Sequence, residues 1–251
     1  MPTEYLYGRR PVLESLRAGR RTLRRLIISE SADDSDLIKE ATTLSREAGI
    51  RVEKARRNVL DGKVPREANH QGVMLEAGEY PYLSLPDLLN DSARQGEPPF
   101  YLLLDLLQDV QNVGTLLRTA EAVGVHGVIV QERRAAGITP AVVSASSGAV
   151  EHLKIAQVTN LVQAMKTLKE AEVWLAGLDV GEDAVRIDQA NLRGGLGLVV
   201  GSEGEGLRRL VRDTCDFIVA LPMRGQIASL NAATAGSIAL YAAWQARGFS
   251  A

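Results

Sequence analysis

Short apolar segments alternate with helical patterns over the C-terminal part of the chain. Six segments are predicted as buried strands: residues 100–107, 127–132, 153–158, 173–180, 196–202 and 217–223. The intervals favour helices, at residues 112–125, 139–150, 160–172 and 207–215, and a last helix of small apolar residues follows. Strands that are apolar on both faces need helices on both sides, so this pattern predicts a parallel sheet of the α/β class.

The N-terminal part also alternates, but its segments are shorter and carry more charge. Strands are predicted at residues 23–29, 50–55 and 72–77. Helices are predicted at residues 10–19, 34–49 and 56–63. These segments predict a small α/β domain.

A proline-rich polar segment separates the two regions. It holds Pro81, Pro86, Pro98 and Pro99, with one short helix predicted at residues 85–89. We therefore expect a first domain at residues 1–79, a linker at 80–98 and a second domain at 99–251.

Composition indicates a globular protein of 251 residues, with 45% hydrophobic and 24% charged residues. Cys215 is the single cysteine, so no internal disulfide can form, which is typical of a reducing compartment. No apolar run approaches the roughly 20 residues of a membrane helix, and the first ten residues lack the apolar core of a secretory signal. We therefore expect a cytoplasmic protein without membrane association.

The formal net charge is −2, so any affinity for nucleic acid depends on how the charges are distributed. Residues 9–25 hold seven arginines against one acid, and residues 51–57 hold a second basic group. One such group alone is explained by a solvated surface, but two in one small region favour contact with a phosphate backbone. The candidates for RNA contact are Arg9, Arg10, Arg20, Arg21, Arg24 and Arg25.

Ligands of parallel α/β sheets bind beyond the carboxyl ends of the strands. Polar and glycine residues gather after three of the predicted strands. These residues are Asp105, Asp109, Asn112, Gly114 and Arg118 in the first group, Glu203, Gly204 and Gly206 in the second, and Arg224, Gly225, Ser229 and Asn231 in the third. The three strand ends are therefore the candidate site.

Several common sites are excluded because their motifs are missing. The turn after the first strand of the second domain has no G-x-G-x-x-G, and the chain has no G-x-x-x-x-G-K-[ST] and no G-x-S-x-G. His70, His126 and His152 lack metal-ligand spacing, so we expect no metal site.

Three segments occur in the order and spacing of a known family. They are "DLLQDVQNVGTLLRTAEAVGVHGVIV" from Asp105, "LVVGSEGEGLRRL" from Leu198 and "LPMRGQIASLNAATAGSIALY" from Leu221. They resemble the motifs of the SpoU/TrmH RNA ribose 2′-O-methyltransferases of the SPOUT superfamily, with "SSGA" at residues 146–149 between the first two. "YLYGRRPVLESLRAG" and "NHQGVMLEA" resemble the substrate-binding domain of RlmB-like enzymes, which methylate a guanosine of 23S ribosomal RNA.

The resemblance implies features that periodicity does not show. It implies a deep trefoil knot at about residues 196–247, an L30e-like N-terminal domain and a homodimer formed through the knotted domain. It also implies S-adenosylmethionine as cofactor and large-subunit ribosomal RNA, not DNA, as partner. The residues that it assigns to the cofactor are Gly201, Leu221, Met223, Gly225 and Leu230.

The resemblance assigns catalysis to five residues, Asn112, Arg118, Glu203, Ser229 and Asn231. As alternatives, Asn112, Ser229 and Asn231 are plausible helix caps, and Glu203 is a plausible first-turn acid. Arg118 is not expected to act as a base, because a guanidinium has a pKa of roughly 12.5 or higher. We expect it to clamp the phosphate beside the target ribose and to stabilise alkoxide charge.

Two departures from the family pattern affect packing more than polar chemistry. Val110 follows Asp109 where the family usually has proline, and "AATAG" follows Asn231 where the family is rich in valine. Two alternative functions stay open: the same reaction on transfer RNA, and RNA binding without catalysis. The intact polar set argues against the second.

Overall fold

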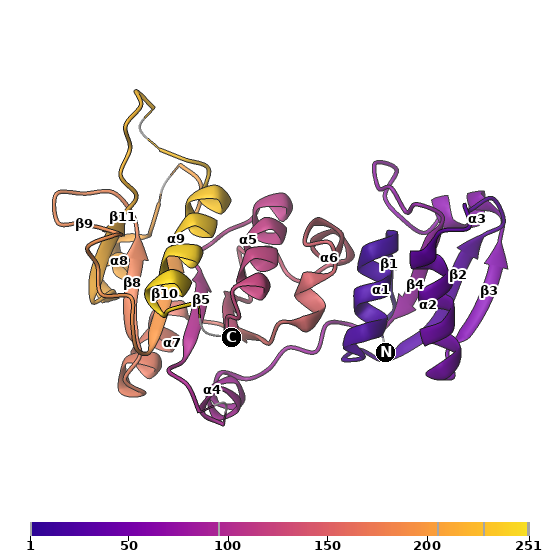
Figure 1. Ribbon diagram of the computed structural model, residues 1–251, viewed down its shortest axis with the longest axis horizontal. Helices are drawn as coiled ribbons and strands as arrows, with labels where there is room; N and C mark the ends of the chain where they lie inside the picture. The colour runs from indigo at the N-terminus through magenta and orange to yellow at the C-terminus, as the bar shows by residue number, and fades with distance from the viewer. Residues whose placement is uncertain (1, 95, 205, 228, 250–251) are drawn as a thin grey trace. The chain divides into compact units, whose positions relative to one another are not determined.

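The computed structural model describes residues 2–94, 96–204, 206–227 and 229–249 (Figure 1). Glu205 and Ala228, which belong to the motifs quoted above, lie outside the described residues. The chain forms two compact units. The first unit contains the chain up to Pro81 together with Ile138–His152, and the second contains Tyr82–Gly137 together with the chain from Leu153 onward.

The first unit is built on a four-stranded sheet in the order β1-β4-β2-β3. Its strands are β1 Glu4–Tyr7, β2 Leu23–Ser29, β3 Arg51–Ala55 and β4 Val73–Ala77. Its main helices are α1 Arg9–Ala18, α2 Asp36–Glu47 and α3 Arg57–Asp61. β4 is antiparallel to β1 and β2, and β2 is parallel to β3. The carboxyl ends of β1, β2 and β3 therefore meet at one edge of the sheet, beside the start of β4.

The segment Ile138–His152 packs within this first unit, although the domain boundary drawn from the sequence placed it in the second domain. It forms α6 Pro140–Ala145 and a 3-10 turn at Ala149–His152 rather than one continuous helix. Ser147 (φ 55°) and Gly148 (φ 88°) interrupt the helix. A Cβ on Gly148 would lie 2.7 Å from the Cβ of Glu14, so glycine allows α1 to approach.

A buried ion pair joins this segment to Arg21, which lies just before β2 in the first unit. Arg21 and Glu151 both have side chains that are at most 1% exposed, and their closest charged atoms are 2.8 Å apart. Arg21 also pairs with Glu4 at 2.6 Å, and burial raises the pKa of the Glu4 carboxyl. Removing one partner from such a pair leaves an uncompensated charge, which costs about 3–5 kcal/mol.

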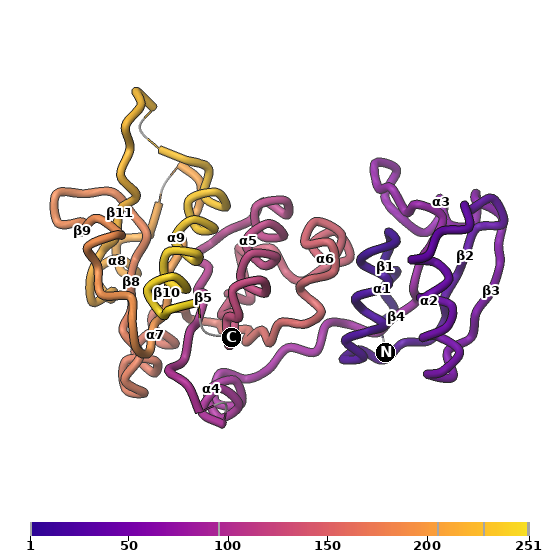
Figure 2. The backbone as a smooth tube through the Cα atoms, viewed as in Figure 1, coloured from indigo at the N-terminus to yellow at the C-terminus, as the bar shows by residue number. Residues whose placement is uncertain are grey.

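The second unit is a seven-stranded parallel sheet in the order β7-β6-β5-β10-β8-β11-β9. Figure 2 labels β5, β10, β8, β11 and β9 along the backbone of this unit. All of its paired neighbours run parallel. Its strands are β5 Phe100–Leu104, β6 Gly127–Gln131, β7 Ile155–Val158, β8 Trp174–Leu178, β9 Val185–Arg186, β10 Leu196–Val200 and β11 Phe217–Ala220. β9, a two-residue edge strand, was not predicted from the sequence.

Helices cover this sheet on both faces. They are α4 Leu85–Ala93, α5 Val110–Ala122, α7 Leu161–Glu170, α8 Arg209–Thr214 and α9 Ala232–Ala246. On one face, α7 and α8 pack through Met165 and Val211 against Leu175 and Val199. On the other face, α9 approaches so closely that a Cβ on Gly236 would lie 2.5 Å from Leu116 of α5. The structure confirms the predicted α/β class, with a parallel sheet and a smaller N-terminal α/β unit.

None of the helices in the described residues is both long and apolar enough to cross a membrane.

Candidate active site

A pocket of about 530 Å³ lies in the second unit, where β8, β10 and β11 end. Three chain segments line it. The segments after β10 and β11 were predicted from the pattern of polar residues, whereas the segment after β8 was not, and the predicted group after β5 does not line the pocket. The lining residues are Leu178, Asp179, Val180, Val200, Gly201, Ser202, Glu203, Gly204, Gly206, Leu221, Met223, Ser229, Leu230, Asn231, Ala232 and Ala235. Ligand pockets are typically about 300–1,000 Å³.

Two glycines bring the loop after β10 into close contact with itself. A Cβ on Gly201 would lie 2.3 Å from the carbonyl carbon and oxygen of Gly206. Gly206 has φ 67°, and a Cβ there would lie 3.0 Å from Asp179 Oδ1. Only glycine fits at Gly201, so the backbone itself forms this wall of the pocket.

The residues assigned to the cofactor divide into two groups. Gly201, Leu221, Met223 and Leu230 line the pocket and combine backbone with apolar side chains. Gly225 does not line it, and nothing lies within 4 Å of the place where its Cβ would be. Four of the five residues assigned to the cofactor from the sequence therefore line this pocket.

Asp179 lines the pocket and was not predicted. It follows β8, a strand that the apolar pattern did predict, so its position directly after that strand was the signal that could have found it. One of its carboxylate oxygens accepts a hydrogen bond from the Val180 amide at 2.8 Å.

Three polar residues from different segments meet at the edge of the pocket. Asn112 Nδ2 donates to Glu203 Oε1 at 2.5 Å. Asn231 Nδ2 donates to the same oxygen at 2.5 Å and to Asn112 Oδ1 at 2.9 Å. Glu203 and Asn231 line the pocket, so the network connects its lining to the start of α5. We call these three residues the amide–carboxylate cluster.

Helix caps explain how the cluster is held. Asp109, not Asn112, caps α5, because its Oδ1 accepts from the Asn112 amide at 2.8 Å. The Asn112 side chain is thereby free to face Glu203. Asn231 does both jobs: its Oδ1 accepts from the amides of Ala233 and Thr234 at the start of α9, while its Nδ2 joins the cluster.

The other two predicted catalytic residues are placed differently. Ser229 lines the pocket. Arg118 lies two helical turns into α5, is exposed and does not line the pocket. Within this single chain, Arg118 is therefore outside the amide–carboxylate cluster.

An ion pair between buried Asp105 and the partly exposed side chain of Arg208 fixes the far end of the loop that carries Glu203. Asp105 is 1% exposed at the end of β5, and Arg208 Nη2 lies 2.6 Å from its Oδ1. The Arg208 amide donates to Asp105 Oδ2 at 3.0 Å. The Asp105 amide also donates to the Val200 carbonyl at the end of β10, at 2.9 Å. Asp105 therefore contacts the chain on both sides of the loop, at Val200 and at Arg208.

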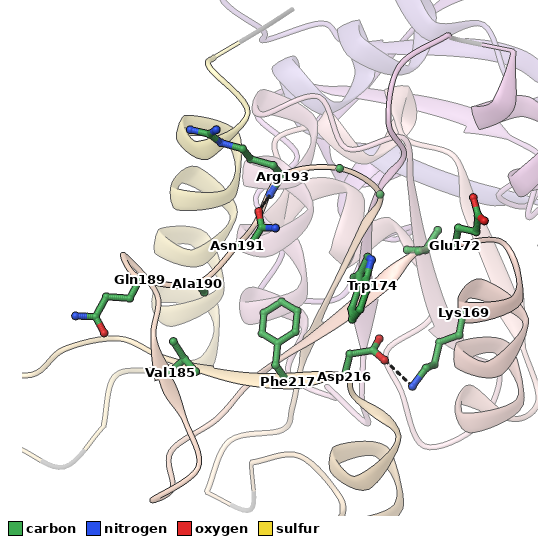
Figure 3. A pocket seen from close by; sticks show the side chains of 13 residues that line it. Lys169, Glu172, Trp174, Val185, Gln189, Ala190, Asn191, Arg193, Asp216 and Phe217 are labelled. Atoms are coloured by element: carbon green, nitrogen blue, oxygen red, sulfur yellow. Dashed lines mark hydrogen bonds and ion pairs between the residues drawn. The ribbon is translucent and has the colours of Figure 1, made fainter.

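A second hollow, of about 810 Å³, opens at the opposite ends of the same strands (Figure 3). Trp174 and Phe217, the first residues of β8 and β11, lie in it, and Trp174 is 61% exposed. Lys169 pairs with Asp216 at 2.7 Å, as the dashed line in Figure 3 marks. None of the predicted catalytic residues lines this hollow.

Residues 99–241 match a family model described as the SpoU rRNA Methylase family, and residues 5–83 match one described as RNA 2′-O ribose methyltransferase substrate binding. YacO of Bacillus subtilis, named as a TrmH family tRNA/rRNA methyltransferase, is 38% identical over 246 residues, which are 97% of this chain and 96% of YacO. The chain belongs to the SpoU rRNA methylase family.

Further similarities agree with this assignment. A tRNA/rRNA methyltransferase of Synechocystis is 37% identical over 253 residues, which cover 98% of this chain and 63% of that protein. The crystal structure of the SpoU methyltransferase AviRb from Streptomyces viridochromogenes, in complex with AdoMet, has a TM-score of 0.78 and 25% identity, covering 99% of this chain and 92% of AviRb.

The arginines predicted to contact RNA lie in the region that matches the SpoU substrate-binding model, and most of them have partners in the protein. Arg21 is buried between Glu151 and Glu4, so the structure corrects the expectation that it lies on the surface. Arg25 pairs with Glu76 and Glu53, and its pKa is raised mainly by these hydrogen bonds. Arg20 Nη1 donates to the Tyr80 hydroxyl at 3.2 Å.

The remaining three arginines of that set differ in exposure, with Arg10 exposed and Arg9 and Arg24 partly buried. Arg24 hydrogen-bonds to Thr3. Arg9 pairs with Asp33 at 3.2 Å and lines a polar pocket in the first unit of this SpoU protein.

The residues that the structure describes contain no group of three or more histidine, cysteine or acidic side chains arranged to hold a metal ion.

Proposed function

We propose that this SpoU methyltransferase methylates a ribose 2′-hydroxyl in RNA, with a guanosine of large-subunit ribosomal RNA as the target. The observation that carries the proposal is the amide–carboxylate cluster of Asn112, Glu203 and Asn231 at the edge of the pocket. These three residues come from the three family motifs. The amides of Asn112 and Asn231 converge on one carboxylate oxygen of Glu203, and this convergence supports a shared catalytic site.

S-adenosylmethionine is the cofactor of this family, and it supplies the methyl group. The pocket fits such a ligand because its volume of about 530 Å³ suits a nucleoside-sized molecule and its lining combines backbone and apolar side chains. Gly201, Leu221, Met223 and Leu230 would hold it, whereas Gly225, which the resemblance also assigned to the cofactor, does not line the pocket. The absence of a side chain at Gly201 is what leaves this wall as bare backbone.

Each residue of the site has a proposed role. Glu203, held by two amides, orients Asn112 and Asn231 toward the substrate ribose, and Ser229 contributes a hydroxyl at the pocket lining. Arg118 binds the phosphate beside the target ribose and compensates charge as the 2′-oxygen becomes anionic. Arg118 is not the base, since its guanidinium keeps its proton.

A homodimer through a knotted region at about residues 196–247 explains why Arg118 lies apart from the pocket. α5 and α9 pack together, joined by the hydrogen bond between Thr119 and Ser237 at 2.9 Å. α9 also exposes Ile238 (45%) and Tyr241 (48%). We propose that a second copy covers these apolar side chains and brings Arg118 beside a complete site. We further propose that the enzyme works in the cytoplasm.

The proposal is tested by mapping 2′-O-methylation in RNA from cells with and without the gene. Purified enzyme with labelled S-adenosylmethionine should then restore the missing mark on RNA from the deletion strain. Restoration on ribosomal RNA supports the proposed target. Restoration on transfer RNA alone supports the alternative that the names of the relatives also allow, and no transfer to either RNA by an enzyme that binds the cofactor contradicts the proposal.

A further inference from the structure

The first unit contains a polar pocket of about 470 Å³ at one edge of its sheet. Four segments line it: the start of α1, the loop after β2, the start of α3 and the loop before β4. The lining residues are Arg9, Ser29, Ser31, Ala32, Asp33, Arg57, Asn69, Gln71 and Gly72. This is the edge where β1, β2 and β3 end, which is where open sheets with helices bind ligands.

The loop before β4 is held in one shape. Gln71 has φ 52° and Gly72 has φ 78°, and a Cβ on Gly72 would lie 2.8 Å from the Cβ of Ala32. His70 is 2% exposed; its Nδ1 accepts from the Gly72 amide at 3.0 Å and its Nε2 lies 2.9 Å from Asp61 Oδ1. A residue other than glycine in the left-handed region costs about 1–3 kcal/mol, and such strain persists where the surroundings impose it.

Three polar residues of the pocket, Arg9, Asn69 and Gln71, already hydrogen-bond to one another. Arg9 Nε donates to the Gln71 carbonyl at 3.2 Å, and the Arg9 amide donates to Gln71 Oε1 at 3.0 Å. Asn69 Oδ1 accepts from the Gln71 amide at 3.0 Å. The acceptor oxygens of Asn69 and Gln71 are thus used by the protein, and their amide NH2 groups remain as donors toward the pocket.

Arg57 gives the pocket its net positive charge, because Arg9 is paired with Asp33. It is exposed, and its side chain forms no ion pair or hydrogen bond with the part of the chain that the structure describes. Arg9 and Arg57 together outweigh Asp33, the single acid in the lining. The result is a rigid hollow with one net positive charge and several NH donors, a combination that suits a phosphodiester rather than an apolar ligand.

We infer that this pocket binds the phosphate backbone of the RNA substrate, with Arg57 as its main contact. The inference rests on the proposed function and assigns a specific surface to the substrate-binding region. The six arginines chosen from the sequence lie between Arg9 and Arg25, whereas Arg57 belongs to the second basic group at residues 51–57, from which no single residue was chosen. Among those six, only Arg9 lines the pocket.

The experiment compares Arg57→Glu with Arg56→Glu in the full-length protein. Arg56 is the adjacent exposed arginine and does not line the pocket, so both variants change the net charge equally. A glutamate at the first position of α3 is compatible with the helix dipole, so the fold should persist. The probes are bulk ribosomal RNA and bulk transfer RNA from Bacillus subtilis, titrated by filter binding at several salt concentrations.

For the RNA that the wild type binds, Arg57→Glu should weaken binding about tenfold or more, because a hydrogen-bonded charge contact is lost and replaced by repulsion. The slope of log affinity against log salt should fall by about 1. Arg56→Glu should stay within about twofold of wild type. Equal losses in both variants, or an unchanged Arg57→Glu, would overturn the inference.

Asn69→Asp provides a second variant that keeps the turn. The aspartate can still accept from the Gln71 amide, but it replaces the amide donor with a negative charge. Binding should fall severalfold while the unfolding midpoint stays the same, and wild-type binding by this variant would count against the pocket.

Enzyme assays separate this inference from the proposed function. With saturating RNA, Arg57→Glu should keep the wild-type kcat and raise the KM for RNA about tenfold. If the wild type methylates RNA and Arg57→Glu does so with an unchanged KM, the pocket assignment fails alone. If the wild type transfers no methyl group but RNA binding still distinguishes Arg57→Glu from Arg56→Glu, the proposed function fails alone.

Discussion

At the residue scale, Glu203 accepts hydrogen bonds from Asn112 and Asn231 on the same carboxylate oxygen. Two amides on one oxygen fix the carboxylate and both side chains at once, so each member depends on the others. Because Asp109 takes over the cap of α5, Asn112 is available for this cluster. Substitutions of Asn112 should therefore affect turnover more than folding, whereas substitutions of Asn231 also remove the cap of α9.

Asn112→Asp tests the cluster with almost no change in size. It places a second carboxylate against Glu203 in place of a donor, and like charges at that distance disfavour the ionised pair. We expect kcat at neutral pH to fall about 10²–10³-fold, with partial recovery as the pH falls and the pair binds one proton. The check is a pH–rate profile with cofactor affinity measured by calorimetry. A flat profile, or loss of cofactor binding with kcat retained, would contradict this role.

Arg118→Lys tests whether a forked guanidinium is needed. Lysine keeps the charge but not the bidentate geometry. We expect kcat/KM for RNA to fall about a hundredfold, with S-adenosylmethionine affinity unchanged because Arg118 does not line the pocket. Steady-state kinetics measures this, and retention of most of the rate would rule out a bidentate clamp.

At the element scale, the loop after β10 depends on a glycine pair. Gly201→Ala would place a methyl group 2.3 Å from the Gly206 carbonyl, so the backbone must move. We expect at least about a tenfold loss of S-adenosylmethionine affinity, because misplaced contacts of the wall weaken the bound state. Isothermal calorimetry measures it.

Gly225→Ala is the matched control for that substitution. Nothing lies within 4 Å of its Cβ position, so this variant should bind the cofactor as the wild type does. Equal losses at both positions would show that Gly225 also contacts the cofactor, and no loss at Gly201 would contradict the proposed cradle.

The apolar pattern predicted the long buried strands well because a strand covered on both faces needs continuous apolar residues, as in Phe100–Leu104 and Leu196–Val200. It missed β1, which has four residues and is partly buried, and β9, which has two exposed residues. It also joined α6 to the following 3-10 turn, because Ser147 gives no signal of its positive φ.

The site residues that carry a family motif could be predicted, whereas those whose role depends on contacts distant in sequence could not. Motif resemblance found Asn112, Glu203 and Asn231, which the structure brings together. Asp179 carries no motif, and the burial of Arg21 depends on Glu151, which is distant in sequence. Charge clusters read from a sequence do not show which arginines already have partners.

At the scale of the whole molecule, His126 is a buried group whose ionisation opposes folding. Burial lowers the pKa of its imidazole, although Glu97 Oε1 lies 3.4 Å away, and its Nδ1 accepts from the Phe100 amide at 3.2 Å. In the unfolded chain His126 has a pKa of about 6.5. As the pH falls through that value, the unfolded state binds a proton that the folded state does not, so stability decreases.

We therefore expect the free energy of unfolding, measured with urea, to fall between pH 7.5 and pH 5.5. His126→Asn can still accept from the Phe100 amide but does not titrate, so the fall should be smaller in this variant. An equal fall in both proteins would place the acid sensitivity on other groups.

The pairing of Arg21 with Glu151 also limits how this enzyme can diversify. Glu151 lies within the stretch that matches the SpoU methylase model, yet its partner belongs to the stretch that matches the substrate-binding model. A protein produced by recombination at the proline-rich linker would take Arg21 from one parent and residue 151 from the other, so the ion pair could be lost. Chimeras that exchange specificity between relatives should therefore survive only when both ancestral halves already share this pair, or when residues 138–152 travel with the N-terminal portion.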